Sequence, residues 1–187
     1  KNGTNFFTGV PDSVLKELSL YLGKNKNNHI LATNEGSAVS IGIGYYLSTK
    51  KIPCIYMQNS GLSNALNPLI SIAHKKVYSI PLLLLIGWRG SPNSNDEPQH
   101  QAQGKVTKNF LKILGIKFIF INQDKDLSKI KDLINYSKKN KKSVAILIRN
   151  NKFNKVLKPK KIKKNESNIK RILFLEIAIS NVLFSVP

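Results

Sequence analysis

Short apolar runs alternate with helix-patterned segments along the first 149 residues, and this alternation limits the fold more than any other feature. Consecutive parallel strands need a crossover connection, which is usually a helix, so strands that alternate with helices indicate a parallel sheet. We therefore predict an α/β fold, an open parallel sheet flanked by helices. Its strands are expected at 6–8, 29–32, 53–57, 82–86, 117–121 and 144–148.

Segments with helical periodicity lie between these runs. Pro11, Asp12 and Ser13 form a turn signal, which predicts a helix start with Asp12 or Ser13 as the N-cap. The segment 35–47 is rich in glycine, alanine and serine, so a helix there can pack closely against a neighbour. Helices are expected at 13–22, 35–47, 62–73, 105–114 and 127–137.

The sheet-like pattern ends near Arg149, so residues 1–149 are predicted to form one domain. Residues 150–168 are rich in lysine and asparagine, as expected of a basic linker. Residues 169–187 are apolar and periodic, and a lone helix there would have nothing obvious to pack against. We expect it to be the first helix of a second domain that is truncated or missing.

The formal net charge of +20 raises the question of nucleic-acid binding. The excess lies in residues 101–187, which hold 21 Lys/Arg and five Asp/Glu, and nearly all of it is lysine. Nucleic-acid binders usually add arginine forks and stacking aromatics to a basic patch. No recognisable nucleic-acid motif accompanies these lysines, so no specific nucleic-acid partner is predicted.

A single cysteine, Cys54, excludes an internal disulfide framework and fits a reducing cytoplasm. The longest apolar run, Ile80–Trp88, is about half the length that a bilayer span needs. We expect a cytoplasmic protein with no membrane partner.

Four segments combine polar groups with glycines beyond what a core needs, and each follows a predicted strand. Ligands bind outside the carboxyl ends of strands in open α/β sheets, so these segments are candidates for a site. The segments are 8–12, 33–36, 58–64, and 87–90 running on to 96–100.

Glu35 and the turn 58–64 each allow two interpretations. Glu35 is either a first-turn carboxylate favoured by the helix dipole, or a sheltered carboxylate that exchanges a proton with a ligand. The turn is either a strand-to-helix connection with Ser60 as N-cap, or a set of amides suited to a heteroaromatic ring. Position alone does not decide between them.

Arg89 and His100 also have a plain and a functional interpretation. Arg89, close to two glycines, is either a solvated loop residue or a fork for phosphonate, sulfonate or carboxylate. His100 is either incidental or a proton donor near neutral pH. The three histidines and Cys54 lack zinc-site spacing, so no metal ligand is predicted. Hydrolase-elbow, P-loop and dinucleotide motifs are absent from the sequence.

At these four segments the sequence resembles the phosphonopyruvate decarboxylases and, more loosely, the sulfopyruvate decarboxylases. The resemblance is carried by FFTGVPDSVLKEL, ATNEGSAVSIGIGYYL, KIPCIYMQNSGLSNALNPL and IPLLLLIGWRG with DEPQHQAQGK, which cover roughly residues 5–116 in order. It implies the pyrimidine-binding domain of thiamine-diphosphate enzymes.

The resemblance also implies roles for individual residues. Glu35 matches the glutamate that hydrogen-bonds the cofactor's aminopyrimidine ring and activates it, and Asp12 matches an acidic residue that faces the substrate and handles protons. His100 is the third catalytic candidate. Further cofactor contacts are implied for Gln58, Asn59, Ser60, Gly61 and Asn64, and substrate contacts for Asp12, Arg89, Gln99 and His100.

The same resemblance predicts what the chain lacks. These enzymes bind Mg²⁺ and the diphosphate through a Gly-Asp-Gly motif in a second domain, and the sequence contains no Gly-Asp-Gly. The metal is therefore expected from a missing domain or a partner chain, within a homo-oligomer or a complex of two chains. The expected reaction is decarboxylation of 3-phosphonopyruvate to phosphonoacetaldehyde in phosphonate biosynthesis. The alternatives are the alpha subunit of a sulfopyruvate decarboxylase and a non-catalytic remnant.

Overall fold

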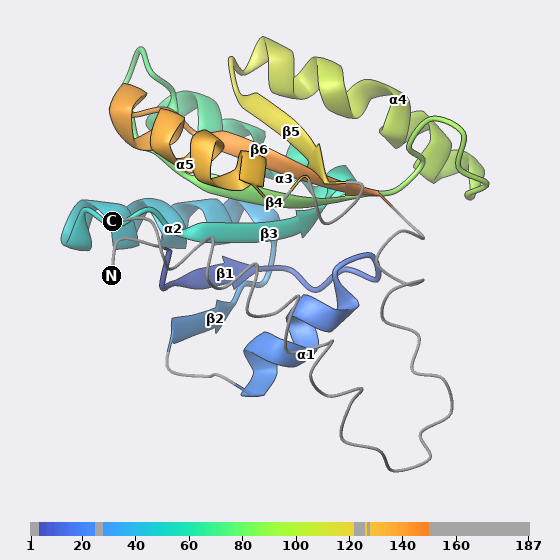
Figure 1. Cartoon of the computed structure of the whole chain (residues 1–187), viewed down its shortest axis with the longest axis horizontal. Coiled ribbons are helices and arrows are strands. Elements are labelled where there is room, and N and C mark those ends of the chain that lie inside the picture. The colour runs from blue at the N-terminus through green and yellow to red at the C-terminus, as the bar shows by residue number, and fades with distance from the viewer. Residues whose placement is uncertain (1–3, 25–27, 122–125, 127, 150–187) are drawn as a thin grey trace.

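A computed structural model describes residues 4–24, 28–121, 126 and 128–149 (Figure 1). These residues form a six-stranded sheet in the order β2-β1-β3-β4-β6-β5, and every strand pair is parallel. The predicted open parallel sheet is thereby confirmed. Its strands are β1 (Phe7–Gly9), β2 (His29–Leu31), β3 (Cys54–Gln58), β4 (Leu83–Trp88), β5 (Lys117–Ile121) and β6 (Val144–Arg149).

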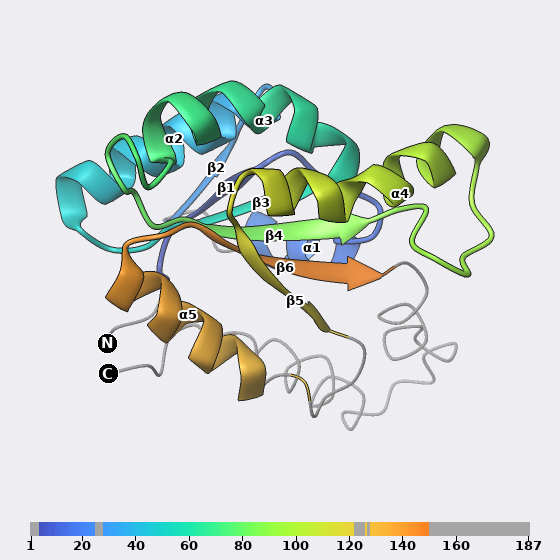
Figure 2. The same cartoon turned by 90° about the horizontal axis from the view of Figure 1, so that it is seen from above.

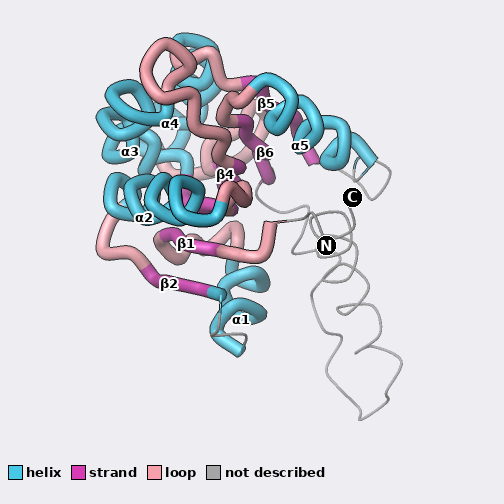
Figure 3. Tube along the Cα trace, turned by 90° about the vertical axis from the view of Figure 1, so that its left-hand side faces the viewer, coloured by secondary structure: helices cyan, strands magenta, loops and turns pink. Residues whose placement is uncertain are grey.

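Helices cover both faces of the sheet, as Figures 2 and 3 show from two directions. One face carries α2 (Glu35–Thr49), α3 (Leu62–Pro68) and α4 (Pro98–Ile113). The other carries α1 (Lys16–Lys24) and α5 (Ser128–Asn140). The sheet is therefore the middle layer of three.

Strand residues divide between the two faces by simple alternation, because successive side chains of a strand point in opposite directions. In β3, Ile55 and Met57 pack toward α2 and α3, whereas Cys54 and Tyr56 pack toward α1. All six residues of β4 are buried, which explains why that segment is the most apolar run of the sequence.

The strand order reverses at β1, which pairs with β2 on one side and β3 on the other. Connections that leave in opposite directions open a crevice at the carboxyl ends of the strands. The register of the ladders places Gly9 beside Tyr56 and Gln58 beside Gly87, so the segments that follow β1, β3 and β4 leave the sheet at the same edge.

The predicted strands agree with the observed ones to within two residues, but two helix starts were wrong. The first helix begins at Lys16, because residues 13–15 form a turn and the Leu15 carbonyl accepts the Ser19 N–H. Asp12 and Ser13 are therefore not its N-cap. The helix expected at 105–114 begins at Pro98, and its polar first turns conceal the helical pattern.

The helix expected at 62–73 changes type along its length. It is α-helical to Pro68 and continues as a π-helical turn over Leu69–Ala73. The predicted linker at 150–168 and helix at 169–187 lie outside the described residues. Among the helices that the structure describes, none has the length and apolar character needed to cross a membrane.

Candidate active site

Glu35 is the first residue of α2, and Asn34 caps that helix. The Asn34 side chain accepts the Ser37 N–H at 2.8 Å, which holds the start of the helix in place. A carboxylate in a first helical turn is favoured by the helix dipole, so the plain interpretation of Glu35 accounts for its position. It does not account for where the side chain points.

The Glu35 carboxylate turns toward the β3–α3 connection. Asn64 on α3 donates its Nδ2 to Glu35 Oε2 at 2.9 Å. The side chain also lies directly over Gly61, where a Cβ atom would come within 2.4 Å of the Glu35 carboxyl group. Any other residue at position 61 would displace the carboxylate. The start of α2 and the β3–α3 connection thus pack against each other through Glu35 and Gly61, which are 26 residues apart in sequence, and Glu35 is partly buried.

The amide side chains of the turn after β3 differ in their exposure to solvent. Gln58 donates its Nε2 to Ser60 Oγ at 2.8 Å, and both residues are half-buried at the strand end. Asn64 is exposed and faces Glu35. Gln58, Ser60, Gly61 and Asn64 therefore lie within one short stretch of the carboxyl edge, as the sequence predicted, although their contacts with a cofactor remain a prediction.

Asn59 is 2% exposed, and all of its hydrogen bonds are made inside the protein. Its Nδ2 donates to the Arg89 carbonyl at 3.1 Å and to Thr107 Oγ1 at 2.9 Å, while its Oδ1 accepts the Arg89 N–H at 3.0 Å. The side chain therefore joins the end of β3 to the end of β4 and to α4. Thr107 was not predicted as a site residue, because its contact with Asn59 depends on the position of α4.

Arg89 forms a two-pronged ion pair with Asp96, seven residues further along the same loop. Its Nε donates to Asp96 Oδ2 at 3.0 Å, and its Nη2 donates to the other oxygen. Asp96 also accepts the N–H groups of Gly90 and Glu97, and its side chain is only 3% exposed. The Arg89 hydrogen bonds hold the pKa of the Asp96 carboxyl well below its usual range.

Asp96 was missed as a site residue, although it lies in the DEPQH segment on which the resemblance rests. An aspartate in a polar loop is predicted to be solvated, and only the structure shows that Asp96 orients Arg89. The Nη1 of Arg89 points toward Ser13 Oγ at 3.4 Å, which directs that side of the guanidinium toward the end of β1.

Asp12, at the end of β1, has the opposite surroundings. It is 7% exposed, and neither carboxylate oxygen completes a hydrogen bond of good geometry within the described part of the chain. It lies flat against Gly87 of β4, where a Cβ atom would come 1.9 Å from Oδ2. Burial raises its pKa, and the nearby N–H groups of 13–15 and the charge of Arg89 offset only part of that effect.

Gln99 and His100 lie in the first turn of α4, with Gln99 exposed and His100 half-buried. The His100 carbonyl packs against Gly90, so this turn lies beside the Arg89 loop. In residues 4–24, 28–121, 126 and 128–149, no interaction joins the His100 ring to Asp12, Arg89 or Glu35, and no three His, Cys, Asp or Glu residues gather as a metal site would require. The roles of Gln99 and His100 stay predictions.

The carboxyl edge thus carries two groups of residues with different chemistry. Glu35, Gly61 and Asn64 form a group in which one carboxylate is contacted by an amide and a glycine. Asp12, Arg89 and Asp96 form a charged group at the ends of β1 and β4. An arrangement of this kind can hold a heteroaromatic ring at one end and an anionic substrate at the other.

Comparison with known proteins agrees with this geometry. The family described as thiamine pyrophosphate enzyme, N-terminal TPP binding domain, matches residues 1–113. That range contains every candidate site residue named above and ends before strands β5 and β6.

Individual relatives carry two kinds of name. A phosphonopyruvate decarboxylase of Streptomyces viridochromogenes is 33% identical over 125 residues, which are 66% of this chain and 31% of that protein. A second, of Streptomyces hygroscopicus, is 37% identical over 106 residues, which are 56% of this chain and 26% of that protein. The sulfopyruvate decarboxylase subunit alpha of Methanococcus maripaludis is 34% identical over 149 residues, which are 79% of this chain and 87% of that subunit. The chain therefore spans less than a third of the two phosphonopyruvate decarboxylases.

Replacing Asp96 by asparagine is expected to lower the free energy of unfolding by about 2 kcal/mol, because the Arg89 guanidinium loses its charged partner in a largely buried setting. Urea denaturation at pH 7 measures the loss. The exposed neighbour Glu97, changed to glutamine, is the control and should cost less than about 0.5 kcal/mol. Equal effects at the two positions would contradict the assignment of Asp96 as the residue that orients Arg89.

Replacing Asp12 by asparagine is expected to stabilise the fold at neutral pH. A carboxyl whose pKa is raised in the folded state loses stability as the pH rises from the unfolded value of 3.8 through the folded value. The advantage of Asp12→Asn over the wild type should therefore be small at pH 3 and grow toward pH 7. A difference between the two unfolding free energies that does not change with pH would show that Asp12 titrates normally.

Proposed function

The chain belongs to the family of N-terminal TPP binding domains of thiamine pyrophosphate enzymes, and we propose that it is the pyrimidine-binding part of a 2-oxo-acid decarboxylase. The observation that carries the proposal is the direction of the Glu35 side chain, which leaves its helix to lie over Gly61 and against Asn64. A carboxylate that served the helix dipole alone would have no need of either neighbour.

These residues fit the ring of thiamine diphosphate. When bound, that cofactor supplies the electron sink that lets a 2-oxo acid lose CO₂. Asn64 donates a hydrogen bond to Oε2 of Glu35, so Oε1 is the oxygen left to meet a ring nitrogen and to hold or release a proton there. Gln58 and Ser60 present further polar groups at the strand end beside it.

Asp12 and Arg89 fit the substrate end of the site. Asp96 holds two nitrogens of the Arg89 guanidinium, which fixes the plane of the fork and leaves the Nη1 side toward the end of β1. A fixed guanidinium suits an anionic group of the substrate. Asp12, buried and with neither carboxylate oxygen in a hydrogen bond of good geometry within the described residues, has a raised pKa that suits it to exchange a proton with the reacting acid.

The substrate that the sequence favours is 3-phosphonopyruvate. Support comes from the GWRG and DEPQH segments and from the two relatives that are named for that reaction. Sulfopyruvate is the second candidate, because a sulfopyruvate decarboxylase subunit alpha is matched over 87% of its length. Both substrates offer a strong anion at one end of a 2-oxo acid.

Mg²⁺ and the diphosphate-binding residues are proposed to come from another domain or a partner chain. The motif expected to hold them, Gly-Asp-Gly, does not occur in the sequence. The subunit name of the methanogen relatives favours a complex of two kinds of chain, and a homo-oligomer of a longer chain is the alternative. Activity is thus proposed for an assembly that contains this domain.

Mixing the chain with a diphosphate-binding partner, thiamine diphosphate and Mg²⁺ should release CO₂ from a 2-oxo acid. Glu35→Gln should lower kcat at least about 100-fold, because the removed carboxylate can no longer take part in proton transfer. Glu17→Gln, on α1 and away from the site, is the matched control and should leave kcat unchanged. Equal rates of CO₂ release by the wild type and Glu35→Gln would contradict the role of Glu35, and no release by either would identify the domain as a non-catalytic remnant.

The two substrates can be told apart in the same assay by kcat/KM for 3-phosphonopyruvate and sulfopyruvate. We expect the phosphonate to be preferred, and Arg89→Lys to lower kcat/KM for it at least about tenfold, because a lysine cannot reproduce the fork. A preference for the sulfonate would identify the chain with the second candidate. An unchanged kcat/KM in Arg89→Lys would remove Arg89 from the substrate site.

A further inference from the structure

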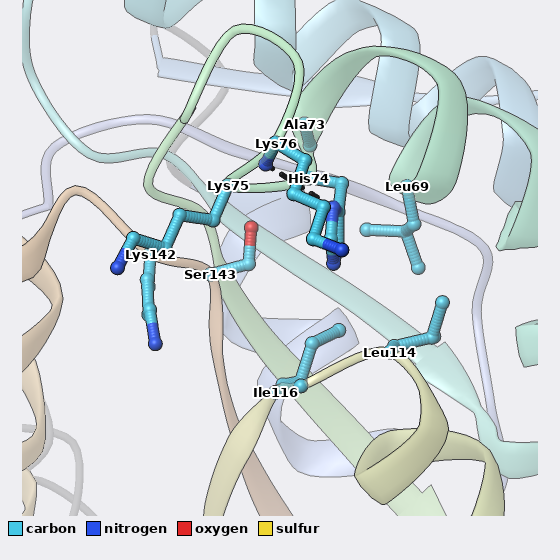
Figure 4. Close-up of a pocket in the computed structure, with 10 residues that line it drawn as sticks. Leu69, Ala73, His74, Lys75, Lys76, Leu114, Ile116, Lys142 and Ser143 are labelled. Atoms are coloured by element: carbon cyan, nitrogen blue, oxygen red, sulfur yellow. Dashed lines mark hydrogen bonds between the residues drawn. The ribbon is translucent and has the colours of Figure 1, made fainter.

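A pocket of about 140 Å³ lies at the amino ends of the strands, on the opposite edge of the sheet from Glu35 and Asp12 (Figure 4). It is formed by the π-helical turn Leu69–Ala73 and the loop that follows it, by the α4–β5 connection, and by the residues that precede β6. None of the residues assigned above to cofactor or substrate lines it. The pocket is therefore separate from the candidate active site.

The lining of this pocket has two chemically distinct sides, whose residues are labelled in Figure 4. Leu69, Leu114 and Ile116 supply an apolar wall. The opposite side is cationic. It consists of the lysines at positions 75, 76 and 142, with His74 and Ser143 between them and the apolar wall.

Among the described residues, the three lysines have no negatively charged partner. No acidic residue lines the pocket, and within the described part of the chain none of the three forms an ion pair. Like charges gathered around a concave surface of low polarity raise the local potential and attract an anion. The pocket thus has a charge that a bound anion would balance.

The rim of the pocket is held firmly by hydrogen bonds between its loops. Ser143 Oγ donates to the Ile80 carbonyl at 3.0 Å, and Ser79 Oγ donates to the Lys141 carbonyl at 2.8 Å. Ser79 and Lys141 both have positive φ values, 54° and 48°, which residues with side chains rarely adopt. At Lys141 the left-handed conformation ends helix α5, and at Ser79 the hydrogen bond to Lys141 helps to fix it.

The apolar wall includes a second unusual backbone feature. Pro68 has no N–H to continue the α-helical pattern, and the chain goes on as the π-helical turn that carries Leu69 and Ala73. Short π-helical turns inside helices are found frequently at functional sites. The pocket is therefore bounded on two sides by backbone that departs from regular structure.

Size and charge together define the ligand. A cavity of roughly 150 Å³ lined by apolar side chains is large enough for a benzene ring. We propose that the pocket binds a small carboxylate with an aryl or branched-alkyl body, the body against Leu69, Leu114 and Ile116 and the carboxylate among the lysines. Residues 150–187 are a poor alternative occupant, because they carry nine Lys/Arg and only two Glu.

Binding of benzoate to the full chain, measured by titration calorimetry, tests this proposal. Benzyl alcohol lacks the charge, inorganic phosphate lacks the apolar body, and benzylamine reverses the charge. Benzoate is expected to bind at least about fivefold more tightly than any of these, and the preference should weaken as salt is added. Equal binding of benzoate and benzyl alcohol, or of benzoate and phosphate, would overturn the proposal.

Two variants locate the bound benzoate. Lys142→Glu should weaken binding at least about fivefold, whereas Lys131→Glu, an exposed change of the same charge on α5, should have no effect beyond about a factor of two. Leu69→Phe should abolish binding by filling the pocket, with the folded state checked by circular dichroism. Binding that survives both pocket variants, or that is lost in Arg89→Lys, would place benzoate elsewhere and contradict the proposal.

Discussion

The side-chain amide of Asn59 joins the ends of β3 and β4 to helix α4 at the carboxyl edge of the sheet. Its Oδ1 accepts the Arg89 N–H, and its Nδ2 donates to the Arg89 carbonyl and to Thr107 Oγ1. Because a buried amide left without partners costs free energy, the loop that begins at Arg89 is held against the turn that begins at Asn59. The turn that presents Gly61 to Glu35 and the loop that presents Arg89 to Asp12 therefore form one connected unit.

That unit places two aspartates in opposite environments on either side of one arginine. Asp96 accepts four hydrogen bonds and stays ionised, whereas Asp12 is buried against Gly87 and has a raised pKa. Carboxyl groups whose pKa values are driven apart in this way divide the work of a site, one as a fixed charge and the other as a group that exchanges protons. Burial of the Asp12 carboxyl opposes folding, because neither oxygen completes a hydrogen bond of good geometry within the described residues.

The parallel sheet and the positions of its strands could be predicted from the sequence, because they depend on the alternation of apolar runs and helical segments, which the runs around Ile55 and Leu84 display clearly. The position of Glu35 and of the turn 58–64 at strand ends followed from the same pattern. Asp96 and Thr107 did not, because their partners are set by the path of a loop and the placement of a helix rather than by neighbours in sequence. The first turns of α4 escaped detection for another reason: they are polar and exposed, so they carry no periodic signal.

Glu35 is proposed to meet the pyrimidine ring of thiamine diphosphate through one carboxylate oxygen while Asn64 donates a hydrogen bond to the other. A crystal structure of the chain assembled with a diphosphate-binding partner and a non-reactive cofactor analogue measures this directly. We expect a ring nitrogen within hydrogen-bond distance of Glu35 Oε1, about 2.6–3.2 Å, with the Asn64 bond to Oε2 retained. A ring bound elsewhere, or a Glu35 side chain turned to solvent in the assembly, would contradict it.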